Sequence, residues 1–443
     1  MALNEHRAAD VVRQHEARIV AAILALGGLA RIIWVVLGHH LKPWASESHN
    51  IAISLARTGR FADPFARGGG PTAHVGMLTP LPSMVVYRLF GVDTPLAEAV
   101  LTLWAIAVIA AGVWLCWRLA RELDAPLLAR LAAVSFVSLS PRQFGLETLE
   151  GRNWEVNLAV VILAWVLLRL VKSKAAKWDT AKTGAISGGL FMISPPAGMG
   201  ALAALSLFHI QRVRPRHWWV ASVAFLAVVG CLGGFWALRN AEQLGSPIAL
   251  RDNFGLELDL SNHQGAVNPS DEYATYWARY NQIHPYGTSA AVIDRMRAAG
   301  EVGYYKKLGQ DARRWIRSHP GQFVEISARH FVEFYFPPKW FWGTYQVTER
   351  KITFRQFLEW LVSFCGLTTL ALLSVRDARY GYILVAVFAC SLPYIMVQPT
   401  LRYRYLVSTL LVFAAFDGVT RLTAIAISRK RLFFSNRQRV AEQ

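Results

Sequence analysis

Residues 218–238 read WWVASVAFLAVVGCLGGFWAL without one charged side chain, and Arg239 and Asn240 follow directly. A helix rises 1.5 Å per residue, so a run of this length crosses a hydrocarbon layer of roughly 30 Å. Further apolar runs occupy 101–117, 156–168, 183–210 and 356–375. Because such runs recur along the chain, the sequence predicts an all-α polytopic membrane protein.

The composition agrees with this class. Apolar residues make up 54% and charged residues 17% of the 443, against roughly 45–50% and 25% in soluble domains. The net charge of +18 comes mostly from basic residues that lie between the apolar runs. No separate basic region with interleaved aromatic residues is present, so nucleic acid is not an expected partner.

We predict about ten transmembrane segments. They lie near 19–38, 96–117, 126–141, 156–171, 183–195, 197–210, 217–238, 356–375, 379–397 and 404–426. Lysine and arginine cluster in alternate connections and in both terminal arms, and such clusters mark the cytoplasmic side. Both termini are therefore predicted to be cytoplasmic, in a chain that contacts membrane lipids.

The run 183–210 contains the helix-breaking sequence Ser194-Pro195-Pro196. Basic clusters flank both of its ends, so both ends are predicted on the cytoplasmic side. Two helices of about 14 residues would be too short to cross separately. We therefore expect a short hairpin that enters the membrane and returns, shielded by other helices.

These spans divide the chain into three parts. Residues 1–238 form an N-terminal transmembrane module whose first outside loop covers 39–94. Residues 239–355 form an extracytoplasmic helical cap, and 356–443 form a C-terminal transmembrane module with a basic cytoplasmic tail. Arg31 lies inside the first apolar run, where it either extends outward or pairs with an inward-facing carboxylate.

The first outside loop carries a candidate functional carboxylate. Glu47 precedes a predicted amphipathic helix, whose apolar stripe is formed by Ile51, Ala52, Leu55 and Ala56. Glu47 is therefore either a helix-terminus charge or a functional group. The stretch GGGPTAH (68–74) lacks the lysine of a phosphate-binding loop. LTPLP (78–82) then predicts a proline-started helix that ends at Gly91.

Several motifs follow one another in a recognisable order. They are the A-x-x-L-x-x-x-G-x-F helix (Ala52, Leu55, Gly59, Phe61), GPTAH (70–74), the helix that ends in LFG (89–91), FWALRN (235–240), RDNFG (251–255) and GEVGY (300–304). This order resembles the family 39-like glycosyltransferases of the GT-C superfamily. Relatives include the protein O-mannosyltransferases and the lipid A aminoarabinose transferase.

The resemblance implies an inverting transfer of a sugar from a polyprenyl-phosphate donor to a glycan, lipid or protein acceptor. The transfer would occur on the outer, periplasmic face of a bacterial inner membrane. Glu47 matches the acidic residue that acts as general base, with Asp63 as the nearby alternative and Glu155 as a supporting carboxylate. The motifs further imply substrate contacts by His74, Arg239, Asn240, Arg251, Asn253, Glu301 and Tyr304.

Arg402-Tyr403-Arg404 stands at the outside boundary of the last predicted span. Arginine binds phosphate oxygens in a two-pronged geometry, so the donor phosphate is one predicted ligand and a lipid headgroup is the other. The histidines show no metal-ligand spacing, and no metal or cofactor is assigned. Two further functions stay open, a ligase for lipid-diphosphate glycans and a transporter or flippase of lipid-linked saccharide.

Overall fold

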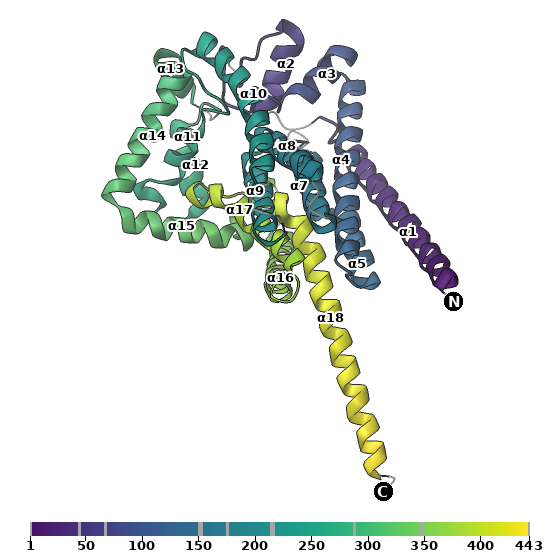
Figure 1. Ribbon diagram of the computed structural model, residues 1–443. Coiled ribbons are helices and arrows are strands. Elements are labelled where there is room, and N and C mark those ends of the chain that lie inside the picture. The colour runs from purple at the N-terminus through teal and green to yellow at the C-terminus, as the bar shows by residue number, and fades with distance from the viewer. Residues whose placement is uncertain are drawn as a thin grey trace.

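The computed structural model describes residues 2–42, 46–65, 69–148, 154–173, 177–212, 218–286, 289–345 and 349–441. Within these residues the chain is helical, and its extended structure is one isolated antiparallel bridge between Ala62 and Pro71. The all-α prediction is confirmed. Figure 1 shows α2, α3 and α13 at one end of the molecule and both termini toward the other.

Among the described residues, seven helices are long and apolar enough to cross a membrane. They are α1 (Ala2–Leu37), α4 (Pro95–Glu122), α7 (Trp154–Lys172), α10 (Trp218–Leu244), α16 (Glu349–Ser374), α17 (Ala378–Met396) and α18 (Leu401–Ala441). The other three predicted segments coincide with α5 (Leu127–Leu139), α8 (Lys177–Ile193) and α9 (Pro195–Arg212). The number of crossings stays a prediction, and the multi-pass character does not depend on it.

The predicted break at Ser194 separates α8 from α9. The two helices have 17 and 18 residues and are therefore longer than we expected, because both continue past the apolar run into its polar flanks. Gly184 and Gly188 allow α8 to approach α10 closely. A Cβ atom on Gly184 would lie 2.3 Å from the Ala221 carbonyl oxygen, and one on Gly188 would lie 2.7 Å from the Phe225 carbonyl oxygen. Such small-residue faces are typical of packed membrane helices.

The shorter helices build the end of the molecule that carries the site. They are α2 (Glu47–Thr58), α3 (Leu81–Phe90), α6 (Phe144–Thr148), α11 (Phe254–Ser261), α12 (Glu272–Ile283), α13 (Ala290–Ala299), α14 (Glu301–Ser318) and α15 (Pro320–Tyr335). Helix α3 ends at Gly91 as predicted. Phe65 packs into one apolar core with residues of α11, α13 and α14, including Leu256, Ile293 and Tyr305. The first loop is thereby joined to the 239–355 region.

Ser46, rather than Glu47, caps α2. The Ser46 hydroxyl accepts a hydrogen bond from the His49 amide at 3.3 Å, and the helix ends at Gly59 with a φ of 73°. A serine N-cap satisfies an amide that has no partner within the helix. The Glu47 carboxylate lies in the first turn and is available for contacts outside α2.

Arg31 pairs with a carboxylate inside the bundle, which confirms one of the two expected arrangements. Its Nε atom lies 2.8 Å from Glu147 Oε2, and its Nη1 atom donates to the Ser138 carbonyl at 2.7 Å. The Tyr405 hydroxyl donates to the other oxygen of Glu147 at 2.9 Å. The ion pair therefore connects α1, α6 and α18.

Glu147→Gln should destabilise the fold because it leaves the Arg31 charge buried opposite a neutral amide. We expect the free energy of unfolding in detergent to fall by about 3–5 kcal/mol. Tyr405→Phe is the matched control, since it removes one hydrogen bond worth about 1 kcal/mol. Equal small losses in the two variants would show that the pair does not hold the bundle.

Candidate functional site

Local hydrogen bonds join Asp63 to Gly70, close to the segment that carries His74. The Asp63 amide donates to the Gly70 carbonyl at 2.9 Å, and the Gly70 amide donates to Asp63 Oδ1 at 3.0 Å. Asp63 has a φ of 58°, a left-handed conformation that aspartate tolerates because its side chain bonds locally. Asp63 therefore closes the loop, which makes it a weaker base candidate than Glu47.

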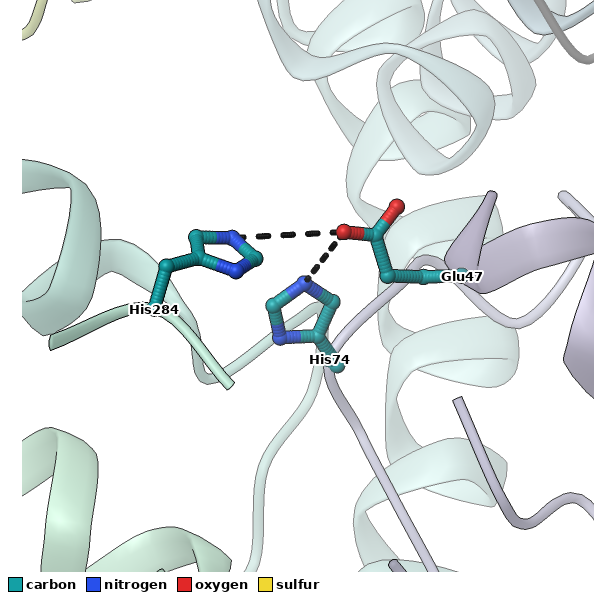
Figure 2. Close-up of side chains that lie close together, drawn as sticks. All are labelled: Glu47, His74 and His284. Carbon is teal, nitrogen blue, oxygen red and sulfur yellow. Dashed lines mark ion pairs between the residues drawn. The ribbon is translucent and has the colours of Figure 1, made fainter. Parts of the chain in front are cut away.

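Glu47 faces two histidines from separate segments (Figure 2). Its Oε1 atom lies 3.9 Å from His74 Nε2 and 3.9 Å from His284 Nε2. The histidine side chains are almost fully buried, whereas 23% of the Glu47 side chain is exposed. The carboxylate is thus the solvent-facing member of the cluster.

Both histidines are neutral at pH 7. Burial lowers the pKa of His284 to about 3 and holds the pKa of His74 well below its usual value, with His284 and Arg251 lowering it further. Tyr280 stacks on the His284 ring with 4.2 Å between ring centroids. An uncharged imidazole can orient the carboxylate through an N–H group without adding a positive charge to the site.

The hydrogen bonds on the far side of each ring indicate where the protons lie. The Tyr286 amide donates to His284 Nδ1 at 3.1 Å, so a neutral His284 carries its proton on Nε2, toward Glu47. The Tyr305 hydroxyl lies 2.8 Å from His74 Nδ1. Burial raises the pKa of Tyr305, so this hydroxyl keeps its proton and is able to donate it. Donation by Tyr305 places the His74 proton on Nε2 as well.

The same three residues are the candidate metal ligands in the part of the chain that the structure describes. Their ligand atoms all lie within 4.8 Å of one another. A metal on Nε2 of His284 requires that atom to be unprotonated, with the proton on Nδ1. Nδ1 instead accepts the Tyr286 amide proton. The proton of a neutral His284 therefore lies on the atom that would have to bind the metal.

A second group of charged residues continues the site. Arg251 Nη2 lies 3.2 Å from Glu155 Oε1, and Thr79 donates to Glu155 Oε2 at 3.1 Å. Burial raises the pKa of Glu257 to about 7; Arg402 and Arg251 lower that pKa, and Glu47 raises it. Glu257 therefore lies within electrostatic reach of both arginines and of the candidate base, which places them in one region.

The two arginines of Arg402-Tyr403-Arg404 have different surroundings. Arg404 is 2% exposed, forms an ion pair with Glu359 and donates to the Ser363 hydroxyl at 2.8 Å. The Arg402 guanidinium lies over the Tyr403 ring, 5.2 Å from its centroid. Tyr403 in turn stacks on Tyr394 with 4.3 Å between centroids. Arg402 is the better placed of the two for an external phosphate.

Several of the residues predicted to contact substrate also bond to the loop or to the backbone. Arg239 donates to the Thr72 and Phe61 carbonyls at 2.8 and 2.7 Å, and Asn240 donates to the Ile248 carbonyl at 2.7 Å. Asn253 precedes α11 and is buried. The Tyr304 hydroxyl donates to the Ile283 carbonyl at 2.8 Å. These residues position neighbours of the site.

The sequence analysis missed four residues of the site: His284, Tyr305, Glu257 and Tyr280. Each lies in the 239–355 region, far along the chain from Glu47. His284 precedes a proline at the end of α12, which is its only local signal. Phe65 packs into the core of α11, α13 and α14, which joins the first loop to the region that carries these four residues.

No family model and no curated protein matches the chain. Similar solved structures include the oligosaccharyltransferase of Archaeoglobus fulgidus in the apo form, with TM-score 0.46, 13% identity, and coverage of 94% of this chain and 52% of that chain. The same enzyme with zinc and sulfate has TM-score 0.45 and 14% identity. The match covers 92% of this chain and 50% of that chain. Its complex with an inhibitory peptide and a dolichol-phosphate has TM-score 0.40 and 14% identity. The match covers 94% of this chain and 52% of that chain. The chain spans about half the length of these proteins, and likenesses at this level assign no family.

Proposed function

We propose that the protein is an inverting GT-C type glycosyltransferase that uses a polyprenyl-phosphate-linked sugar. The observation that carries the proposal is the position of Glu47. It lies between two neutral histidines and within one electrostatic region with Arg251 and Arg402. A base and phosphate-binding cations in one region are what transfer from a lipid phosphate needs. The family 39-like order of motifs supports the same function.

The reaction is a single displacement. The acceptor hydroxyl oxygen attacks the anomeric carbon, its proton passes to Glu47, and the bond between that carbon and the phosphate oxygen breaks. The polyprenyl phosphate leaves with the bonding electrons. Because one displacement occurs, the configuration at the anomeric carbon inverts. His74 and His284 orient the carboxylate, and Arg251 and Arg402 stabilise the charge that develops on the phosphate.

A small pocket beside Arg251 supports a lipid-linked donor. Its walls are Gly76, Met77, Met192, Pro195, Trp236 and Leu250. Met192 and Pro195 flank the break between α8 and α9, so the predicted helix break forms part of this wall. Apolar walls next to one guanidinium combine the two kinds of surface that a lipid phosphate requires. The acceptor is a glycan, a lipid or a protein.

We place the site on the non-cytoplasmic face of a bacterial inner membrane, with residues 239–355 on the same side. The distribution of basic residues supports this orientation. In a background without native cysteine, Ser270→Cys should react with a membrane-impermeant maleimide in intact spheroplasts, and Ser435→Cys should react only after lysis. Labelling of Ser435→Cys before lysis, with Ser270→Cys protected, would reverse the orientation.

Glu47→Gln should lower turnover by something like 10²–10⁴, because glutamine cannot accept the acceptor proton. Mass spectrometry of lipid extracts from cells without the gene identifies the donor lipid that accumulates. The purified variant is then assayed on that lipid for release of polyprenyl phosphate. Melting temperature should change little, because Ser46 already caps α2.

Asp63→Asn is the matched control for Glu47→Gln. Asparagine tolerates the left-handed conformation and keeps an oxygen that accepts the Gly70 amide proton, so turnover should stay near that of the wild type. Near-normal turnover in Glu47→Gln, together with a large loss in Asp63→Asn, would transfer the base role to Asp63.

Arg402→Gln should weaken donor binding with the fold intact. We expect at least a tenfold rise in Kd for undecaprenyl phosphate, measured by native mass spectrometry, because one phosphate-binding cation is lost. Arg404→Gln should instead lower the melting temperature, since it leaves the buried Glu359 without its charged partner. The opposite pattern would assign the phosphate to Arg404.

A further inference from the structure

Helix α14 binds the segment that carries His74 at two points, one helical turn apart. Glu301 Oε2 accepts a hydrogen bond from the Thr72 hydroxyl at 2.6 Å, and Oε1 accepts one from the Ala73 amide at 2.7 Å. Four residues later, the Tyr305 hydroxyl lies 2.8 Å from His74 Nδ1. Glu301 therefore binds the segment through its backbone and Thr72, while Tyr305 binds the His74 ring.

The other side of the segment is held by α10 and by the residues before α11. Arg239 donates to the Thr72 carbonyl at 2.8 Å, and the Asp252 amide donates to the Ala73 carbonyl at 3.1 Å. The positive charge of Arg239 also lowers the pKa of Glu301. Backbone groups on both sides of Ala73 are thus bonded within one network, which leaves His74 little freedom to turn away from Glu47.

Asp252 is the unusual member of this network. Both of its carboxyl oxygens are buried, and the side chain that they face is the Glu301 carboxyl group. Burial and the neighbouring Glu301 raise the pKa of Asp252 to about 9. Burial likewise raises the pKa of Glu301, although the hydrogen bonds from Thr72 and Ala73 lower it. Asp252 therefore carries a proton at pH 7, in a dry site that it shares with Glu301.

We propose that Glu301, Tyr305 and a protonated Asp252 are positioning residues that hold His74 against Glu47. The protonated Asp252 presents an O–H group to Glu301, and Glu301 keeps a single negative charge opposite Arg239. When Asp252 loses its proton, two carboxylates face each other and Glu301 is driven from Thr72 and Ala73. Glu301, which the family resemblance makes a substrate contact, acts here through His74. The link to catalysis rests on the proposed function, whereas the structural role does not.

The sign of the pH effect follows from the raised pKa. A carboxyl group whose pKa is higher in the folded chain favours folding at low pH, and that contribution is lost as the pH rises through about 9. The titratable and charged groups that face the pair are Glu301 and Tyr305 on α14, Arg239 on α10, and His74. His74 is neutral throughout this range. The release of the segment is therefore expected between pH 8 and 10.

Hydrogen–deuterium exchange tests the structural role without a substrate. Wild type and Asp252→Asn are compared at the same pH, because the asparagine amide donates to Glu301 at every pH. Protection of a peptide that covers residues 71–75 should be equal in the two proteins at pH 7. At pH 10, one unit above the pKa, the wild-type segment should exchange about tenfold faster than that of Asp252→Asn.

Asp294→Asn is the matched control, since Asp294 is an exposed aspartate on α13 and its variant should follow the wild type at both pH values. Equal exchange of wild type and Asp252→Asn at pH 10 would overturn the proposal. If Asp252→Asn does not fold, Glu301→Gln provides the same test. Glutamine has one side-chain oxygen, so it can accept only one of the two hydrogen bonds that Glu301 accepts from Thr72 and Ala73. Residues 71–75 of Glu301→Gln should therefore exchange faster than those of the wild type already at pH 7.

The role of Tyr305 is tested on turnover, with its neighbour as control. Tyr305→Phe removes the bond to His74, whereas Tyr304→Phe removes a bond to the Ile283 carbonyl and leaves His74 in place. We expect Tyr305→Phe to lower kcat at least tenfold with KM for the donor unchanged, and Tyr304→Phe to lower it far less. Equal losses in both would reduce Tyr305 to a packing residue. No turnover in the wild type on any donor lipid would defeat the proposed function, whereas the exchange results would stand.

Discussion

The architecture depends on a charge that has no water to solvate it. Arg31 lies in the first span, and a guanidinium there is tolerated only if carboxylate and carbonyl oxygens replace its hydration shell. Glu147 and the Ser138 carbonyl do so at 2.8 and 2.7 Å, and Tyr405 satisfies the remaining oxygen of Glu147. Each partner comes from a different helix, so the charge fixes how α1 packs against α5, α6 and α18.

The site is built on the ends of the helices that this pair aligns. Helix α1 leads into the segment before Glu47, and Tyr405 follows Arg402 by less than one helical turn on α18. The pair therefore fixes the end of α18 that carries the candidate phosphate ligand. Arg404 uses a second buried carboxylate, Glu359, to fix the rotation of α18. Arg404 is thereby committed to the bundle, whereas the Arg402 guanidinium lies over the Tyr403 ring.

The fold was largely predictable from the sequence, because apolar runs and basic flanks report on single helices. The break at Ser194 and the helix end at Gly91 follow from local rules, whereas the pairing of Arg31 was one of two expected arrangements. The site was predictable only in part. Glu47 has a local signal, whereas His284 enters the site through tertiary packing of α12. The lengths of α8 and α9 differ from expectation because polar residues at a membrane surface can stay helical.

The motifs RDNFG and GEVGY, recognised as sequence patterns, have a physical reason in this fold. Gly300 precedes α14 with a φ of 72°, a conformation that glycine adopts without the steric penalty that other residues incur. A Cβ atom on Gly255 would lie 2.2 Å from the Tyr305 carbonyl oxygen, so only glycine lets α11 and α14 approach this closely. That approach brings Asp252 to Glu301 and Tyr305 to His74. The glycines of both motifs thus act on the site without touching it, through the distance between two helices.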